Sequence, residues 1–191
     1  MTVTARTIGA SVLVGALLMT PATSQGQAAG EVFTATAVTK TASGASANAP
    51  VTIAIDRKMS QGEVDSLVVA FKTGGAAGLR KGFVGLPPTG SVRIGEGQVT
   101  PTRFTLERVT SVGRLLTILT DRPLLFIGGG APDAKPREGY EFAVIDIEVD
   151  AKGNGSGTFA PAAKLKMTQG SLFVDDYGAN LVRLTAVKKT Q

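Results

Sequence analysis

Apolar and polar residues alternate along most of this chain, and that alternation constrains the fold more than any other feature. In residues 51–56, Val51, Ile53 and Ile55 are apolar and the residues between them are polar or small. A period of two is typical of a β-strand with one face buried. The same pattern, or a short run rich in β-branched residues, predicts further strands at 31–42, 92–94, 99–109, 115–120, 124–127, 140–150, 158–168, 171–174 and 180–188.

Between residues 60 and 86 the apolar spacing changes to that of a helix. Ser60 and Glu63 have the spacing of a capping box, in which each side chain bonds the other residue's backbone N–H. Val64 and Leu67 then continue at helical spacing. The Gly74-Gly75 pair ends this helix, and a second, glycine-containing helix follows over 76–84. The segment therefore predicts a helical hairpin.

These elements predict an α+β fold in a single β-rich domain spanning residues 29–191. No strand–helix–strand alternation is present, so a parallel wound sheet is not expected. We expect a mostly antiparallel sandwich or open barrel, with the one helical hairpin inserted between its second and third strands. The nearly continuous apolar runs at 115–120 and 124–127 are typical of strands buried on both faces.

The pairing of two later strands can be predicted in more detail. The apolar residues of both 140–150 and 158–168 are odd-numbered, so the hairpin must pair odd with odd positions. A three-residue loop at 154–156 achieves this. It places Ile145 opposite Leu165 and Asp146 opposite Lys164.

The first 28 residues predict a cleavable signal peptide. Arg6 precedes an apolar stretch at 8–19, and Gly26-Gln27-Ala28 offers a small-residue cleavage site. The stretch is well short of the roughly 20 apolar residues that cross a bilayer, and no later segment is long enough either. We therefore expect a periplasmic or secreted bacterial protein. Because the chain has no cysteine, it is neither lipidated at its cleavage site nor held by disulfides.

Composition excludes several functions. The chain contains no histidine and no cysteine, which removes Ser-His-Asp and Cys nucleophile chemistry, the usual zinc sites, and haem ligation by either residue. The net charge of +5 comes from scattered basic residues, and there are few aromatic residues to stack on bases. Nucleic-acid binding normally needs a concentrated basic patch and a motif, so we do not expect it.

Four residues are candidates for a metal or catalytic site. Asp146, Glu148 and Asp150 lie on one strand face, about 6.5 Å apart, a spacing that suits calcium or a carboxylate glycosidase. Asn154 extends the set into a loop that resembles the start of a calcium-binding loop, although Lys152 occupies the next ligand position. The alternative is a solvated strand face and a plain hairpin turn.

We expect no catalytic residue and no cofactor, with calcium as the one candidate ion. The function that follows is an exported, non-enzymatic binding or structural domain whose partner is an envelope or extracellular macromolecule, or an apolar ligand. Two alternatives remain open. One is a carboxylate- or calcium-dependent enzyme acting on glycans. The other is a carrier that holds an apolar ligand between the sheet and the helical hairpin.

Overall fold

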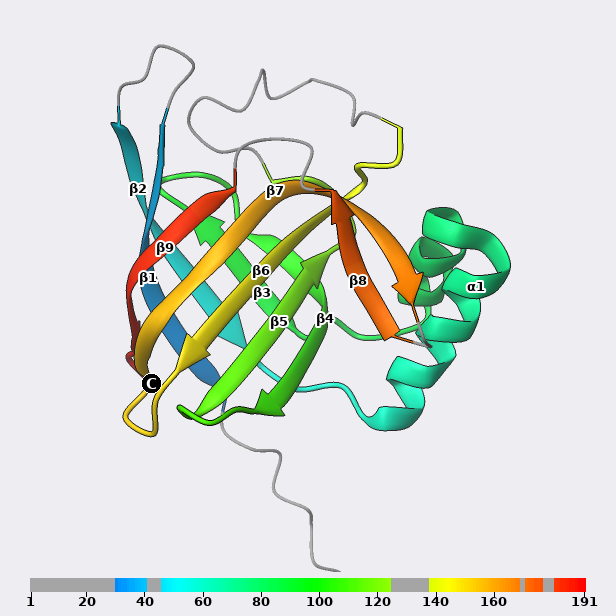
Figure 1. The fold of residues 1–191 in the computed structure, drawn as a ribbon, viewed down its shortest axis with the longest axis horizontal. Coiled ribbons are helices and arrows are strands. Elements are labelled where there is room, and N and C mark those ends of the chain that lie inside the picture. Colours follow the sequence, from blue (N-terminus) through cyan, green and yellow to red (C-terminus); the bar gives the residue numbers. More distant parts are fainter. Residues whose placement is uncertain (1–29, 41–45, 125–137, 169–170, 177–180) are drawn as a thin grey trace, which may run out of the picture.

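The computed structural model describes residues 30–40, 46–124, 138–168, 171–176 and 181–191, which form nine strands and one helical element (Figure 1). The expected signal peptide lies outside these residues, as do residues 125–127 of one predicted strand. The elements are β1 (Glu31–Lys40), β2 (Ser46–Ile55), α1 (Gln61–Val84), β3 (Gly90–Ile94), β4 (Thr100–Val109), β5 (Arg114–Thr120), β6 (Phe142–Val149), β7 (Asn154–Thr168), β8 (Ser171–Asp176) and β9 (Val182–Lys189).

Eight of these described strands close into an antiparallel barrel. Neighbours pair in the order β1, β2, β3, β4, β5, β6, β7, β9, and β9 pairs back with β1. The predicted class, α+β and mostly antiparallel, is confirmed. The sheet is closed, however, and not the sandwich or open barrel that we expected. Closure depends on β9 entering between β7 and β1, a long-range pairing that no local pattern reveals.

The barrel interior is filled by apolar side chains. Ile145, Ile147 and Val149 of β6 are buried there with Phe33 of β1 and Phe159 of β7. Strand β7 lies so close to its neighbour that a side chain would not fit at two of its glycines. A Cβ at Gly155 would lie 1.8 Å from the carbonyl oxygen of Glu148, and one at Gly157 would lie 2.2 Å from that of Asp146.

An ion-pair network closes the end of the barrel at which β1 begins and β9 ends. The guanidinium of Arg114 donates two hydrogen bonds, of 2.8 and 3.0 Å, to the carboxylate of Glu31. Lys189 Nζ donates a third to Glu31 at 2.8 Å, and Glu107 pairs with both Arg114 and Lys58. The guanidinium carbon of Arg114 also lies 5.8 Å from the centre of the Phe33 ring. The network therefore covers the apolar interior with paired charges.

The helical element begins as the sequence predicts. Ser60 Oγ accepts a hydrogen bond from the Glu63 backbone N–H, and the Glu63 carboxylate accepts one from the Ser60 backbone N–H at 2.8 Å. α1 runs to Val84 as one element and is interrupted at Gly75, where φ is 56°. A Cβ at Gly78 would lie 2.2 Å from the Ala70 carbonyl oxygen, so the segments on either side of the interruption pack closely.

α1 covers part of the outer surface of the barrel and forms a second core there. Its buried residues Leu79 and Phe83 pack on the outward-facing side chains of β4, β5 and β6. The Phe83 and Phe142 rings meet edge to face, with centres 6.3 Å apart. The nearly continuous apolar run of β5 is thus explained, because Leu116 faces the interior core and Leu119 faces this outer one. No helix in the described ranges is long and apolar enough to cross a membrane.

The predicted register of the β6–β7 hairpin is wrong. Ile145 pairs with Phe159, not Leu165, and Asp146 pairs with Thr158, not Lys164. The turn lies earlier than expected because the Asp150 side chain accepts backbone N–H bonds from Lys152 and Asn154, at 2.8 and 2.9 Å. The second half of β7 therefore extends past the paired part of β6. It pairs with β8, and this hairpin projects from the barrel toward α1 (Figure 1).

Candidate functional site

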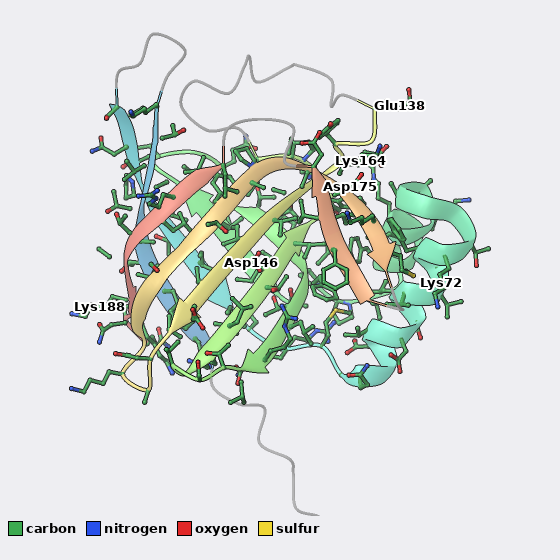
Figure 2. All side chains as sticks on the ribbon, in the orientation of Figure 1. Lys72, Glu138, Asp146, Lys164, Asp175 and Lys188 are labelled. Atoms are coloured by element: carbon green, nitrogen blue, oxygen red, sulfur yellow. The ribbon has the colours of Figure 1, made fainter. Side chains whose placement is uncertain are left out.

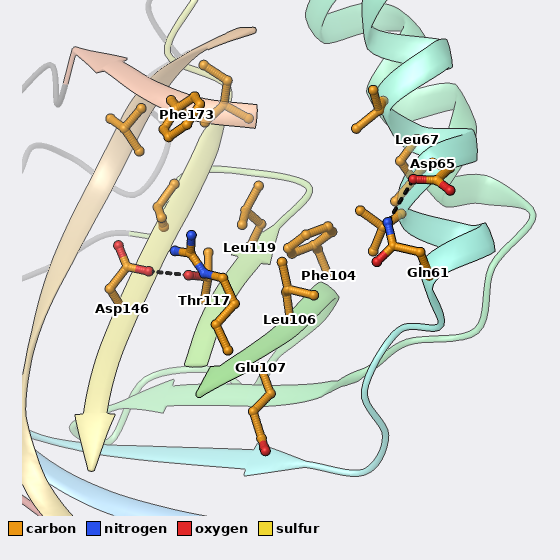
Figure 3. Close-up of a pocket in the computed structure, with 16 residues that line it drawn as sticks. Gln61, Asp65, Leu67, Phe104, Leu106, Glu107, Thr117, Leu119, Asp146 and Phe173 are labelled. Carbon is orange, nitrogen blue, oxygen red and sulfur yellow. Dashed lines mark hydrogen bonds between the residues drawn. The ribbon is translucent and has the colours of Figure 1, made fainter. Parts of the chain in front are cut away.

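A groove of about 560 Å³ lies on the outside of the barrel, between α1 and the β7–β8 hairpin. Its floor is the outward face of β4, β5 and β6, and α1 and β8 form its sides (Figure 3). Figure 3 shows Phe104, Leu106 and Leu119 on the floor, with Leu67 on the α1 side and Phe173 on the β8 side. The volume lies within the range of about 300–1,000 Å³ that is usual for small-molecule sites.

The groove walls are mostly apolar. α1 contributes Val64, Leu67 and Val68, β6 contributes Val144, and the β7–β8 hairpin contributes Leu165, Phe173 and Val174. Phe173 is 47% exposed, so a large aromatic ring stands partly in solvent at the edge of the groove. A partly exposed ring beside an apolar depression is a feature that a bound apolar molecule would cover.

A carboxylate lies on the floor of this apolar groove. Asp146 Oδ1 accepts a 2.6 Å hydrogen bond from Thr117 Oγ1, the residue directly opposite it on β5 (Figure 3). Burial raises the pKa of Asp146 above its ordinary value, and the Thr117 hydrogen bond and the charge of Arg108 partly oppose this rise. Strand pairing across β4, β5, β6 and β7 places four residues in one row, in the order Leu106, Thr117, Asp146, Thr158. The acid is therefore held by strand pairing and not by a loop.

Three other charged side chains line the groove. Glu107 pairs with Lys58 and Arg114 and so contributes little net charge. Asp65 lies exposed on α1, where its carboxylate accepts a 2.8 Å hydrogen bond from Gln61. Arg108 is exposed on β4, close enough to Asp146 to lower its pKa. The polar part of the groove is therefore centred on Asp146 and Arg108.

The structure does not gather the four predicted candidates into one site. Asp146 lies in the groove, whereas Glu148 is exposed farther along β6. Asp150 forms the turn, and its hydrogen bonds from the backbone of Asn154 and Lys152 hold its pKa below the usual range. Asn154 is exposed at the start of β7. Within the described ranges, no three His, Cys, Asp or Glu residues are close enough together to hold a metal ion.

The predicted cross-strand ion pairs are also rearranged. Lys164 lies opposite Asp176 of β8, and Lys166 Nζ is 3.0 Å from Asp175 Oδ1. Figure 2 shows Lys164 beside the β7–β8 hairpin, away from Asp146 on β6. Lys166 therefore links β7 to β8 through an ion pair, and neither lysine lies opposite the acidic residues of β6.

Sequence reasoning missed Thr117, Arg108 and Phe173 as parts of a site. The sequence feature that could have indicated the groove floor is the run of apolar residues on both faces of β5 and β6. Such runs indicate that the outer face is covered, but they do not say that the cover leaves a groove. Phe173 carries no sequence signal of its own, because its position depends on where β7 leaves the barrel.

A single half-buried carboxylate and a nearby guanidinium in an apolar groove can orient a small ligand by its polar end. Comparison with known protein families, with curated sequences and with solved structures finds no significant match.

Proposed function

We propose that this protein is an exported, non-enzymatic binding protein that holds a small apolar or amphiphilic molecule in the groove between the barrel and α1. The observation that carries the proposal is the groove itself: about 560 Å³, walled by apolar side chains from α1, the barrel and β8, with one hydrogen-bonding carboxylate on its floor. The exported location rests on the signal-peptide pattern of residues 1–28.

Apolar burial supplies the affinity in this proposal. Each methylene group that leaves water contributes about 0.8 kcal/mol, so a chain of moderate length lying in the groove gains enough to offset the entropy lost on binding. The exposed part of Phe173 would be covered by such a chain. Strand pairing fixes the floor, so the site needs little reorganisation when the ligand enters.

The alternative of a carboxylate enzyme has less support. Such an enzyme needs two carboxyl groups facing one substrate, at about 5–10 Å. Of the three acids on which that alternative rested, Asp146 lines the groove, Glu148 is exposed beyond it, and Asp150 is engaged in a turn. The arrangement favours a ligand held by its apolar body over a substrate held between two acids.

Two neighbouring valines of α1 provide a matched test. Val68 lines the groove, whereas Val69 is 59% exposed and lies outside it. The purified protein would be extracted with organic solvent, analysed by mass spectrometry for co-purified lipid, and then titrated with Nile red, a fluorophore that responds to apolar surroundings. Val68→Glu is expected to weaken Nile red binding at least about ten-fold, because it places an unpaired charge in the groove.

Val69→Glu adds the same charge to the same helix and is expected to change the affinity by about two-fold or less. Thermal unfolding of both variants checks that they remain folded. The proposal is wrong if the wild-type protein binds no apolar probe, or if both variants bind it as tightly as the wild type does.

A further inference from the structure

We infer that the groove selects ligands whose polar head is uncharged and carries both a hydrogen-bond donor and an acceptor, as a hydroxyl or a primary amide does, with Asp146 and Arg108 as the residues that recognise it. This inference rests on the proposed function and names the chemical class of its ligand.

Asp146 offers the acceptor. One of its carboxylate oxygens accepts a hydrogen bond from the Thr117 hydroxyl. No other hydrogen bond to this carboxylate comes from the part of the chain that the structure describes. Strand pairing places Thr117 and Thr158 on either side of it, and both are uncharged. The carboxylate thus retains accepting capacity toward the groove.

Arg108 offers the donors. Its guanidinium makes no ion pair or hydrogen bond with any described side chain, although it lines the same groove and its charge acts on Asp146. A guanidinium has five N–H donors. The polar end of the groove therefore presents donors on β4 and an acceptor on β6, with the Thr117 hydroxyl on the strand between them.

The opposite charges of these two residues disfavour a charged head. A carboxylate head would gain from Arg108 but would be repelled by Asp146, and an ammonium head would experience the reverse. The other charged residues lining the groove do not remove this balance, because Glu107 is paired with Lys58 and Arg114, and Asp65 lies exposed on α1. A neutral head can accept from Arg108 and donate to Asp146 at once, and it loses less hydration on entry.

The test uses four probes with the same ten-carbon chain: decanol, decanamide, decanoate and decylamine. Their affinities are measured at neutral pH by displacement of Nile red from the wild-type protein, below the concentrations at which they self-associate. Decanol and decanamide are expected to bind at least about ten-fold more tightly than either charged probe, a difference of about 1.4 kcal/mol.

Variants then assign the discrimination to its residues. Asp146→Asn removes the negative charge and is expected to raise decanoate affinity about five- to ten-fold relative to decanol, and Arg108→Gln is expected to do the same for decylamine. Glu148→Gln is the matched control. It removes a charge from the same strand outside the groove and is expected to leave the order of the four probes unchanged.

The outcomes separate this inference from the proposed function. If none of the four probes binds, the proposed function itself is wrong. If all four bind with similar affinity, or a charged probe binds most tightly, the groove is a binding site but the inference about its head group is wrong. The wild-type series decides this alone, so the inference remains testable even if one variant folds poorly.

Discussion

Replacing Glu31 with Gln removes the central charge of the network that closes one end of the barrel. The Glu31 carboxylate accepts two hydrogen bonds from Arg114, at 2.8 and 3.0 Å, and one from Lys189, at 2.8 Å. The Glu31 side chain is 14% exposed. The Arg114 hydrogen bonds, opposed by burial and reinforced by Lys189, lower the pKa of Glu31 from 4.5 to about 2. Its charged form is therefore much better stabilised in the folded chain than in the unfolded one.

The pKa gives the size of the expected loss. A fall from 4.5 to about 2 corresponds to about 3.4 kcal/mol of folding free energy. Solvent reaches this end of the barrel and screens the charges, so we expect about half of that, roughly 1.5–2 kcal/mol, to be lost in Glu31→Gln at pH 7. At a typical urea dependence, this loss lowers the unfolding midpoint by about 1 M.

The pH dependence identifies the cause of that loss. A lowered folded-state pKa gives stability that is fully present above the unfolded value of 4.5 and disappears as the pH falls toward about 2. Urea unfolding, followed by far-UV circular dichroism at a series of pH values, should show the wild type and Glu31→Gln converging as the solution is acidified. Glu148→Gln, which removes an exposed acid, should follow the wild type throughout.

Two results would refute this reasoning. A deficit in Glu31→Gln that is as large at pH 3 as at pH 7 would show that packing, and not charge, is lost. A deficit below about 0.5 kcal/mol at pH 7 would show that the network contributes no more than an ordinary surface ion pair.

Three further predictions concern stability, and each is measured by urea unfolding. Gly155→Ala should destabilise the protein by more than about 3 kcal/mol, because its Cβ would overlap the Glu148 carbonyl oxygen. Gly74→Ala, whose Cβ would meet nothing within 4 Å, should be neutral or slightly stabilising. Equal effects of the two substitutions would contradict the close approach of β7 and β6. Phe83→Ala should cost about 3–5 kcal/mol through the cavity it leaves against Phe142, and a loss below about 1 kcal/mol would show that α1 is not firmly packed on the barrel. Asp146→Asn should be more stable than the wild type at neutral pH, because burial raises the pKa of Asp146 and penalises its charged form. This advantage should shrink as the pH falls through that pKa, and an advantage that persists in acid would contradict its electrostatic origin.

The sequence was sufficient to predict elements whose signals are local. The alternation of Val51, Ile53 and Ile55 predicts β2, and the pair Ser60 and Glu63 predicts where α1 begins. Each depends on neighbouring residues and a fixed geometric period. Barrel closure depends instead on β9 pairing with β1, at the other end of the domain, and a period carries no information about which distant strand becomes a partner.

The register of β6 and β7 shows a different limit. The requirement that odd positions face odd positions holds in the structure, where Ile145 lies opposite Phe159, and it also holds in the predicted register opposite Leu165. Any even shift satisfies the same rule. The choice was made by the turn, in which the Asp150 side chain accepts two backbone N–H bonds and Gly153 adopts a φ of 81°. Those are properties of a loop conformation, which the alternation of the strands does not encode.

The missed register and the missed site have one origin. In the predicted register Lys164 would lie opposite Asp146, neutralise it and leave a solvated face. Because the turn comes earlier, β7 has residues left over after its pairing with β6 ends, and these pair with β8. That projecting hairpin becomes one side of the groove, and Lys164 lies opposite Asp176 of β8 instead of opposite Asp146. The half-buried position of Asp146, in which burial disfavours its charged form, is thus a consequence of where β7 begins, and a carboxylate on the floor of an apolar groove suits the proposed ligand-binding role.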